Sequence, residues 1–457
     1  MSTEEVVSRR LEEIRLLREE NVELQRLVQV LREQLAAAEE RIAELEQVKK
    51  GAPSFVKPNK PKGSEPKEPR RRRAPEHNRG RRRAEVVTRR EEHRIERCPE
   101  CACKLRKTRV AWRRVIVDVP VPTPVEVTEW VIFKGYCPRC ETWHYGEAPE
   151  TGDVIGQRRF GAGLTALIGF LSETLRLPYA TIKSYLKTLH GLEISEGAIA
   201  DVRRGLAQKL EPTVEAMKAQ IRSSAIVHAD ETGWREDGQN GYIWVFSMPG
   251  EQGIRYYQYE KSRAHQVVEE FLGEAFQGVL VSDFYGAYNV YPGPHQRCWV
   301  HLLRDLHTLK ETYAEDDTVQ RWARDLRALY DRGKSFVETE PGDQEERERF
   351  YLVLWNEVER LGLLYAREKH PCRALAKRVL RHQDELFQFV RVAGLAADNN
   401  LAERSLRPLV VVRKISGGTR SPQGSLTRMT LASLFATLKA RGLNPFQECL
   451  ALIQTDP

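Results

Sequence analysis

Two aspartates each follow a short apolar run of the kind that forms a buried strand. Asp230 comes just after residues 225–227 and Asp283 just after residues 279–281, so each is expected at a strand end. Acidic side chains at neighbouring strand ends can converge, because adjacent strands lie ~4.8 Å apart and ligands gather at strand ends in open α/β sheets. Two carboxylates held this close repel each other unless a cation lies between them. Oxygen ligands with water in the remaining positions suit Mg²⁺ or Mn²⁺.

A site that holds two such ions needs a third carboxylate. The candidate is Glu403 in the string DNNLAER at residues 398–404. The same string has a structural interpretation, in which Asn400 caps a helix and Glu403 completes a capping box. Taken alone, each of the three acids is more simply a surface group or a cap. Together, two strand ends and a later helix predict one site that holds two Mg²⁺ or Mn²⁺ ions on Asp230, Asp283 and Glu403.

Four cysteines form two Cys-x-x-Cys pairs, Cys98 with Cys101 and Cys137 with Cys140. Without a secretory signal, such pairs favour metal over disulfides. Four thiolates make a closed tetrahedral site for one structural Zn²⁺, and strands can fill the gap between the pairs. Cys103 is a possible substitute ligand. A reduced redox pair would need a thioredoxin-like context, which this sequence lacks.

The strands that must carry the two aspartates are expected at four places. Apolar and β-branched residues mark three strands, at residues 225–229, 242–247 and 254–259. A helix at 265–276 and a fourth strand at 278–282 follow. This order matches the opening of a ribonuclease-H-like α/β fold. Residues 296–395 are expected to be mostly helical.

Residues 157–222, upstream of the strands, are expected to be helical, since apolar residues recur at helical spacing. Helices at 179–189 and 195–206 would be joined by a turn at His190-Gly191, and Ser195 is a good N-cap. The pair is either a helix-turn-helix that binds DNA or part of an ordinary bundle. The sequence does not separate these two interpretations.

The basic charge of the chain is concentrated in one segment. The 457 residues carry a net charge of +8, whereas residues 51–90 alone hold 14 Lys and Arg against 4 Asp and Glu. Little of this segment is apolar, so it cannot bury enough surface to offset its ordering entropy. It is expected to be a disordered arm that binds nucleic acid, or else a merely solvated linker. Its arginine clusters are Arg70, Arg71, Arg72, Arg73 and Arg81, Arg82, Arg83.

Residues 1–48 show a heptad repeat. Mostly β-branched residues occupy position a, Leu dominates position d, and Asn21 is the one polar residue at a. This pattern favours a parallel two-stranded coiled coil over a lone helix packed on its own domain, with Asn21 fixing register and oligomer number. It predicts at least a homodimer.

Three strings resemble the catalytic blocks of IS66-family transposases. They are HADETGW at 228–234, SDFYGAY at 282–288 and DNNLAER at 398–404. The order of parts is also similar over nearly the whole chain, from the coiled coil and basic linker to the zinc module and catalytic region. The resemblance implies a ribonuclease-H-like core with an Asp-Asp-Glu triad and a mostly helical insertion before the Glu, here at about 311–395.

This resemblance implies a transposase that cuts and joins DNA. Two ions ~3.5–4 Å apart can activate water and stabilise the leaving oxygen of an in-line displacement at phosphorus. Asp230 would bridge the ions, while Asp283 and Glu403 would each complete one coordination shell. The expected partners are double-stranded DNA, as transposon ends and target, a second copy of the chain, and small accessory proteins from the same element.

Further residues are expected to support this chemistry. Cys298 and His301 form a Cys-x-x-His pair after the second Asp. His301 would steady the scissile phosphate or the active-site helix, although a packed cysteine and an ordinary histidine explain the pair equally well. Basic residues that could contact phosphates are Arg304, Arg404, Arg407, Arg413 and Lys414.

Two alternative functions remain open at this point. One is a DNA-binding regulator without chemistry, and the other is a ribonuclease-H-like nuclease without a joining step. No membrane partner is expected, because the longest nearly apolar stretch, residues 160–171, is shorter than the ~20 residues that span a bilayer. No signal peptide opens the chain, so a cytoplasmic location is expected. The expected parts are a coiled coil at 1–48, a linker at 49–92, a β-rich zinc module at 93–150, helices at 157–222, a catalytic domain at 223–445 and a tail at 446–457.

Overall fold

The computed structural model describes residues 29, 90, 96–97, 99–104, 106, 110, 125–146, 159–339 and 342–455. The chain divides into two units, residues 1–117 and 118–457. Apart from Gln29 and Arg90, the expected coiled coil and basic linker lie outside the described residues, so both stay predictions. In the first unit, Arg97 and Lys104 form an isolated bridge around the turn that contains Cys101.

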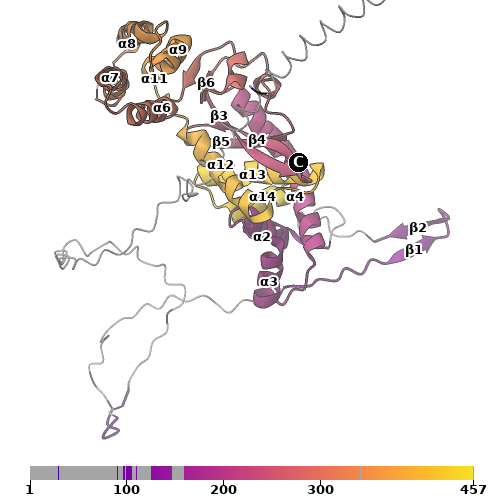
Figure 1. Cartoon of the computed structure of the whole chain (residues 1–457). Helices are drawn as coiled ribbons and strands as arrows, with labels where there is room; N and C mark the ends of the chain where they lie inside the picture. The colour runs from indigo at the N-terminus through magenta and orange to yellow at the C-terminus, as the bar shows by residue number, and fades with distance from the viewer. Residues whose placement is uncertain are drawn as a thin grey trace, which may run out of the picture. The chain divides into compact units, whose positions relative to one another are not determined.

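A five-stranded sheet forms the centre of the second unit, in the order β5-β4-β3-β6-β7 (Figure 1). The strands β3 (Ile226–Glu236), β4 (Gln239–Met248) and β5 (Ile254–Glu260) make an antiparallel meander. Next to β3 lie β6 (Val279–Ser282) and then β7 (His295–Arg297), both running parallel to it. The result is a mixed sheet with its parallel half beside β3.

The four expected strands are all present, with two differences. The first strand does not end before Asp230 but continues to Glu236, because the Asp237-Gly238 turn returns the chain as β4. Both turn residues have positive φ, 49° and 75°, as a tight hairpin turn requires. The fifth strand, β7, was not expected, since its side chains are polar although they are buried.

One face of the sheet is covered by a helix that precedes β3 in the sequence and by a helix that follows β5. Trp244 and Phe246 of β4 point to this face and pack with α4 (Glu196–Arg222) and α5 (Gln266–Leu272). The ring of Phe246 stacks on Phe271 of α5, with centroids 3.5 Å apart. More buried hydrophobic residues pack on this face of the sheet than on the opposite one.

The opposite face carries the alternate residues of the same strands. Ile243 and Val245 of β4 pack against α12 (Asn400–Ser416), which contributes Leu409 to the cluster. The next helix, α13 (Pro422–Ala440), closes the far edge along β5 and reaches both faces. The face under α12 is therefore where residues from β3 and from α12 can meet.

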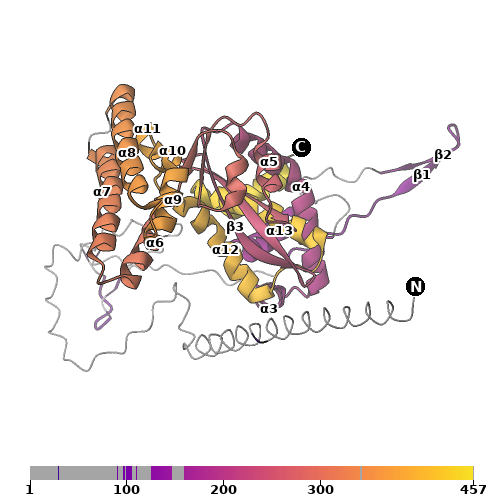
Figure 2. The same cartoon turned by 45° about the horizontal axis from the view of Figure 1, so that its top comes forward.

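Between β7 and α12 the chain forms a group of helices with its own core, beside the sheet (Figure 2). The expected insertion at about 311–395 is helical, but α6 already starts at Trp299 and shares the core. No helix in the described part of the chain is both long enough and apolar enough to cross a bilayer. The helices are α6 (Trp299–Thr312), α7 (Asp317–Thr339), α8 (Gln344–Tyr365), α9 (Arg373–Arg381), α10 (Gln383–Leu386) and α11 (Gln388–Arg391).

Three helical segments that precede the sheet in the sequence pack together: α2 (Ala162–Glu173), α3 (Tyr179–His190) and the first half of α4. As expected, Gly191 ends α3 in a left-handed conformation, and the Ser195 hydroxyl caps α4 by accepting from the N–H of the residue three along, at 3.1 Å. The DNA-binding helix-turn-helix stays a prediction, because this packing is compatible with either interpretation.

The carboxy-terminal segment differs from expectation. Residues 446–457 were expected to be a tail, yet α14 (Pro445–Gln454) occupies most of them. Its Cys449 and Ile453 are buried in the core formed with α2 and α4. Asn444 caps the helix through its side chain, and Pro445 stands at the first position, where its missing N–H costs nothing.

Candidate active site and metal-binding hairpin

The register of the parallel strands brings the two aspartates together. His228 of β3 lies opposite Val281 of β6. Asp230 stands two residues further along β3, and Asp283 stands two residues after Val281, directly after the end of β6. Asp230 also lies opposite Val245, which packs under α12. The Asp230 side chain therefore belongs to the face on which α12 lies, and the charge of Asp283 reaches it from the end of β6.

The third predicted acid reaches the same place from α12. Glu403 stands in the first turn of that helix. Burial, together with the charges of Glu231, Asp283 and Glu403, raises the pKa of Asp230 to about 8. The charges of the other carboxylates thus reach Asp230, and a divalent cation relieves repulsion of this kind. The donor set fits Mg²⁺ or Mn²⁺.

The capping interpretation of the DNNLAER string is wrong. Asn399, not Asn400, is the cap residue, and its side chain makes no capping hydrogen bond. Asn400 is already inside the helix, and its N–H donates to the Asp398 carboxylate at 3.0 Å. The Glu403 Oε1 atom is buried and has no hydrogen-bond partner. Glu403 therefore does not complete a capping box at the start of α12.

Asn399 joins β3 to α12, a role that the sequence reasoning missed. Its side chain is fully buried, and Nδ2 donates to the Ala229 carbonyl oxygen at 2.7 Å. Its Oδ1 pairs with Nδ1 of His228 at 3.2 Å. Burial lowers the pKa of His228 to about 4, so the ring is neutral and Nδ1 must carry the hydrogen. Asn399 thereby sets Glu403 against the strand that carries Asp230.

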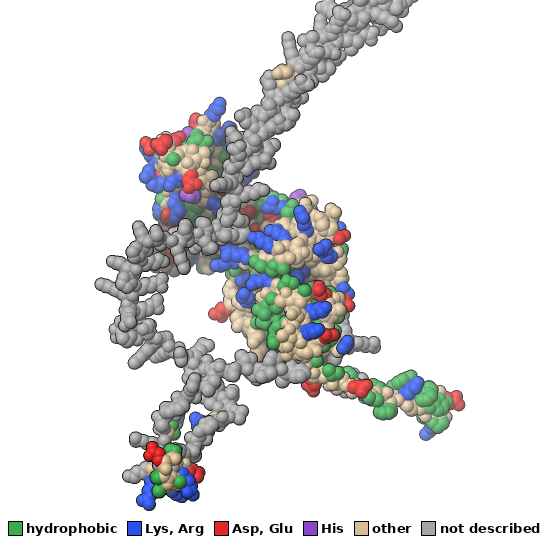
Figure 3. All heavy atoms as spheres, turned by 60° about the horizontal axis from the view of Figure 1, so that its bottom comes forward, with side chains coloured by type: hydrophobic (Ala, Val, Ile, Leu, Met, Phe, Trp, Pro, Cys, Tyr) green, Lys and Arg blue, Asp and Glu red, His purple; other side chains and the backbone are tan. Residues whose placement is uncertain are grey.

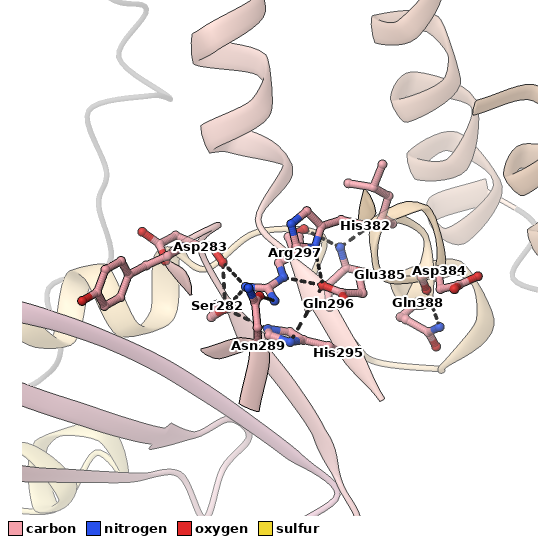
Figure 4. A network of polar contacts seen from close by, with 12 residues as sticks. Ser282, Asp283, Asn289, His295, Gln296, Arg297, His382, Asp384, Glu385 and Gln388 are labelled. Carbon is pink, nitrogen blue, oxygen red and sulfur yellow. Dashed lines mark hydrogen bonds and ion pairs between the residues drawn. The ribbon is translucent and has the colours of Figure 1, made fainter. Parts of the chain in front are cut away.

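A polar network below β6 holds the backbone of Asp283 (Figure 4). The buried guanidinium of Arg297 donates to the Asp283 carbonyl oxygen at 2.8 Å and to Asn289 Oδ1 at 2.6 Å. It also forms an ion pair with Glu385 from the helical insertion. His382 adds a 3.0 Å contact to Glu385. Sequence reasoning missed Arg297, whose signal is a charged residue at the end of a short buried strand.

Glu231, next to Asp230, points to the other face of β3. It accepts hydrogen bonds from Tyr288 and from Arg263, whose guanidinium lies 3.8 Å over the ring of Tyr285. Tyr285 and Tyr288 both belong to the second motif string, so this cluster links the first two strings. Arg263 remains partly exposed beside them and could contact a phosphate.

The Cys-x-x-His pair lies beside Glu403. Cys298 is fully buried at the start of α6, and its Sγ accepts from the Asn399 N–H at 3.2 Å. His301 Nδ1 lies 3.8 Å from Glu403 Oε1. The pair thus lies next to Glu403, and its supporting role at the active site stays a prediction. Arg404, the other expected supporting residue, is exposed on α12.

The basic residues near the end of α12 differ in their surroundings. The Arg413 guanidinium is half-buried and donates to the Gly233 carbonyl oxygen and to Thr232 Oγ1 at 3.3 Å. It therefore ties α12 to β3, whatever else it contacts. Lys414 is exposed, as are the side chains of Arg304 and Arg407.

A second group of metal-ligand side chains lies on a hairpin of β1 (Lys134–Cys137) and β2 (Thr142–Tyr145). Ligand atoms of Cys137, Cys140 and His144 lie within 4.8 Å of one another. Backbone N–H groups at Cys140 and Arg139 lower the pKa of the Cys137 thiol. This group could hold one zinc ion. The sequence reasoning missed His144, although the spacing Cys-x-x-Cys-x-x-x-His was its signal.

The other two predicted zinc ligands remain untested. Cys98 lies outside the described residues, and Cys101 belongs to the other unit of the chain. The hairpin carries exposed apolar side chains, among them Trp143 and Tyr145 (Figure 3). The Lys134 ammonium lies 4.8 Å from the ring centroid of Trp143. The hairpin therefore presents an aromatic and basic surface beside its metal-ligand group.

Comparison with known proteins places this geometry in a family. Over 284 residues the chain is 25% identical to the uncharacterized protein y4qI of Sinorhizobium fredii (strain NBRC 101917 / NGR234), across 56% of this chain and 52% of that protein. It is 32% identical over 171 residues to y4jO of the same organism, across 36% of this chain and 49% of that protein. The chain thus spans about half the length of these two relatives. The model for "Transposase IS66 family" matches residues 157–426, more than half of the chain, which therefore belongs to the IS66 family of transposases.

Proposed function

We propose that this protein is a DNA transposase that cleaves the ends of its element and joins them to target DNA. Asp230, Asp283 and Glu403 form its catalytic triad on a ribonuclease-H-like core. The observation that supports the proposal is the register of β3 and β6, in which Asp230 and Asp283 each follow one of the paired residues His228 and Val281 by two positions. The strand order and the membership of the family support the same conclusion.

Two divalent cations bound to these carboxylates would stabilise both the attacking and the leaving oxygen of a displacement at phosphorus. Asp230 lies where the charges of both other acids reach it, so it is the residue best placed to serve both cations. Asn399 and Arg297 fix the backbones that carry the triad. End cleavage and strand transfer use the same site, because each displaces an oxygen at phosphorus.

DNA is engaged outside the triad in this proposal. The arginine-rich linker and the zinc module bind the transposon ends, with Cys98 and Cys101 joining Cys137 and Cys140 around one structural Zn²⁺. His144 is a competing fourth ligand for the same ion. The coiled coil makes the protein at least a dimer, which lets two ends be held together. Accessory proteins from the same element are further expected partners.

The test uses purified full-length protein, labelled terminal-repeat DNA, unlabelled target DNA and Mg²⁺. Wild type is expected to release a 3′-hydroxyl at the transposon end and then to form joined products. Asp230→Asn is expected to bind the same ends and give neither product. Thr312→Ala, in α6 away from the triad, serves as a matched surface control and should cleave normally.

The outcomes separate three functions. Nicks without joined products from the wild type would indicate a ribonuclease-H-like nuclease instead. Binding without cleavage by the wild type, in both Mg²⁺ and Mn²⁺, would indicate a DNA-binding regulator. Cleavage that survives Asp230→Asn would remove the triad from the mechanism altogether.

A further inference from the structure

Two side chains of a different ligand type, a thiol and an imidazole, lie beside Glu403 of the triad. Sγ of Cys298, a ring nitrogen of His301 and a carboxylate oxygen of Glu403 are all within 4.8 Å of one another. The starts of α6 and α12 are held together by backbone groups as well, since the Trp299 N–H donates to the Ala397 carbonyl oxygen at 3.0 Å. The cluster is therefore built by two anchored helix ends rather than by a loop.

Two of the three ligand atoms have no partner. His301 Nδ1 and Glu403 Oε1 are both buried without a hydrogen bond, yet they face each other at 3.8 Å. Among the described residues only Thr174 Oγ1 shares this condition. Leaving a buried polar atom unpaired costs ~1–3 kcal/mol. A group that binds both atoms at once would remove that cost.

The donor set selects the kind of group. A thiolate, an imidazole and a carboxylate are ligands of Zn²⁺ and related ions, whereas Mg²⁺ takes oxygen ligands almost alone. Zinc bonds to these atoms are ~2.0–2.3 Å long, so two atoms on one tetrahedral ion lie roughly 3.3–3.8 Å apart. His301 Nδ1 and Glu403 Oε1 are already 3.8 Å apart, and no pair in the group is more than 4.8 Å apart, so the set closes with an approach of at most roughly 1 Å. A fourth position would remain for water.

The thiol must lose its proton for this to happen. Burial raises the pKa of Cys298 to about 11, while the backbone N–H groups of Asn399, His301 and Val300 act in the opposite direction. A bound zinc ion deprotonates a coordinating thiol outright. The N–H groups that already point at Sγ are the partners that a thiolate there would require.

We propose that Cys298, His301 and Glu403 bind one Zn²⁺, and that this ion competes with the catalytic cations for Glu403. The binding site stands on its own geometry, whereas the competition rests on the proposed function. A zinc ion there draws the Glu403 carboxylate toward α6 and away from the two aspartates. Zinc is therefore an inhibitor of this protein at the very residue that completes its triad.

The binding test uses Co²⁺ as a probe, because a cobalt–thiolate bond absorbs in the near ultraviolet. The full-length chain carries serine at Cys98, Cys101, Cys137 and Cys140, so that the expected zinc module is silent. We expect one equivalent of Co²⁺ with a thiolate absorption that disappears in Cys298→Ser and weakens by at least about tenfold in affinity in His301→Ala. Cys449→Ser, at a buried cysteine outside both ligand groups, should leave it unchanged.

An absent thiolate absorption, or one that persists in Cys298→Ser, would overturn the site. His301→Ala guards against a folding artefact, since that side chain is partly exposed and its loss should preserve the far-ultraviolet circular dichroism.

For the competition, micromolar Zn²⁺ should suppress Mg²⁺-dependent cleavage by the wild type, and suppression of Cys298→Ser should need a Zn²⁺ concentration at least about tenfold higher. Equal inhibition of both would refute the competition. Failure of the wild type to cleave DNA would refute the transposase proposal while leaving the cobalt result standing.

Discussion

The side-chain amide of Asn399 donates a hydrogen bond to the carbonyl oxygen of Ala229, the residue before Asp230, at 2.7 Å. The two residues are 170 positions apart in the chain, and most of the intervening length is the helical insertion. The bond fixes the start of α12 against β3 in spite of that separation. Asn399 in the string DNNLAER thus has a structural role, which is to position Glu403 relative to Asp230.

Asn399→Ala is expected to lower the free energy of unfolding by about 2–3 kcal/mol, because the Ala229 carbonyl and the His228 N–H are left buried without partners. Cleavage should fall by about 100-fold, since a displacement of ~1 Å at a reacting group has that effect. Urea unfolding and a cleavage assay measure the two changes. The matched control is Asn400→Ala, which should unfold at the wild-type urea concentration. Equal effects at both positions would contradict the assigned role.

Arg297→Met is expected to destabilise the protein by about 3–5 kcal/mol, because it leaves the partly buried Glu385 without its cation. Arg297→Lys should rescue little, since one ammonium cannot reach Asp283, Asn289 and Glu385 together. In a double-mutant cycle with Glu385→Gln, the coupling should be about 1–3 kcal/mol. Denaturant unfolding provides each of the four free energies.

The exposed pair Arg327 and Asp331, 3.0 Å apart on α7, is the control for this cycle. Arg327→Ala should cost less than about 1 kcal/mol, because surface ion pairs contribute little. A coupling as small at Arg297 as at Arg327 would mean that the network beneath Asp283 is not held by its charge.

The strands of the sheet were largely predictable from the sequence, for a physical reason. Apolar runs indicate where the strands lie, and strand alternation then indicates which side chains share a face, because both follow directly from the order of residues. The fifth strand was hidden, since His295, Gln296 and Arg297 are polar residues buried by their bonds to one another and to the insertion. Hydrogen-bond partners of these side chains lie roughly 90 residues away in the chain, so a local sequence pattern cannot reveal them.

The same limit explains the residues that were missed at the site. Asn399 and Arg297 act through contacts with distant segments, so neither stands out by spacing. His144 and Glu231 did lie next to predicted residues, and each was hidden by a stronger motif beside it. The extension of β3 beyond Asp230 had a local signal, the Asp237-Gly238 turn. A prediction based on apolar runs alone does not use that signal.

In the metal-free protein, the contribution of Asp230 to stability is expected to fall as pH rises from about 5 to about 8. The folded-state pKa of Asp230 is about 8, above its ordinary value of 3.8, so between these values the folded state binds the extra proton. Stability falls with rising pH wherever the folded state is the more protonated one. In EDTA, the gap in unfolding free energy between Asp230→Asn and wild type should widen over this range by on the order of 1–3 kcal/mol.

Added Mg²⁺ should reverse this trend, because it replaces the proton as the counter-charge. Its effect on the wild-type melting temperature should therefore be larger at pH 8 than at pH 5, and small in Asp230→Asn at both. Differential scanning fluorimetry gives this comparison directly. Parallel pH curves for the two proteins in EDTA would show that Asp230 does not carry the shift.

Arg413 and Arg407 offer a direct separation of folding from DNA binding on α12. Arg413 donates to β3, so Arg413→Ala is expected to reduce the free energy of unfolding by about 1–2 kcal/mol and to leave the salt dependence of DNA binding unchanged. Arg407 is exposed, so Arg407→Ala should change stability by less than about 0.5 kcal/mol. If Arg407 neutralises a phosphate, its loss should flatten the slope of log affinity against log salt by about 0.9. Fluorescence anisotropy over a salt series, with urea unfolding of the same samples, measures both quantities. A flattened slope in Arg413→Ala at unchanged stability would instead make Arg413 the phosphate contact, and its bonds to β3 would then be incidental to the fold.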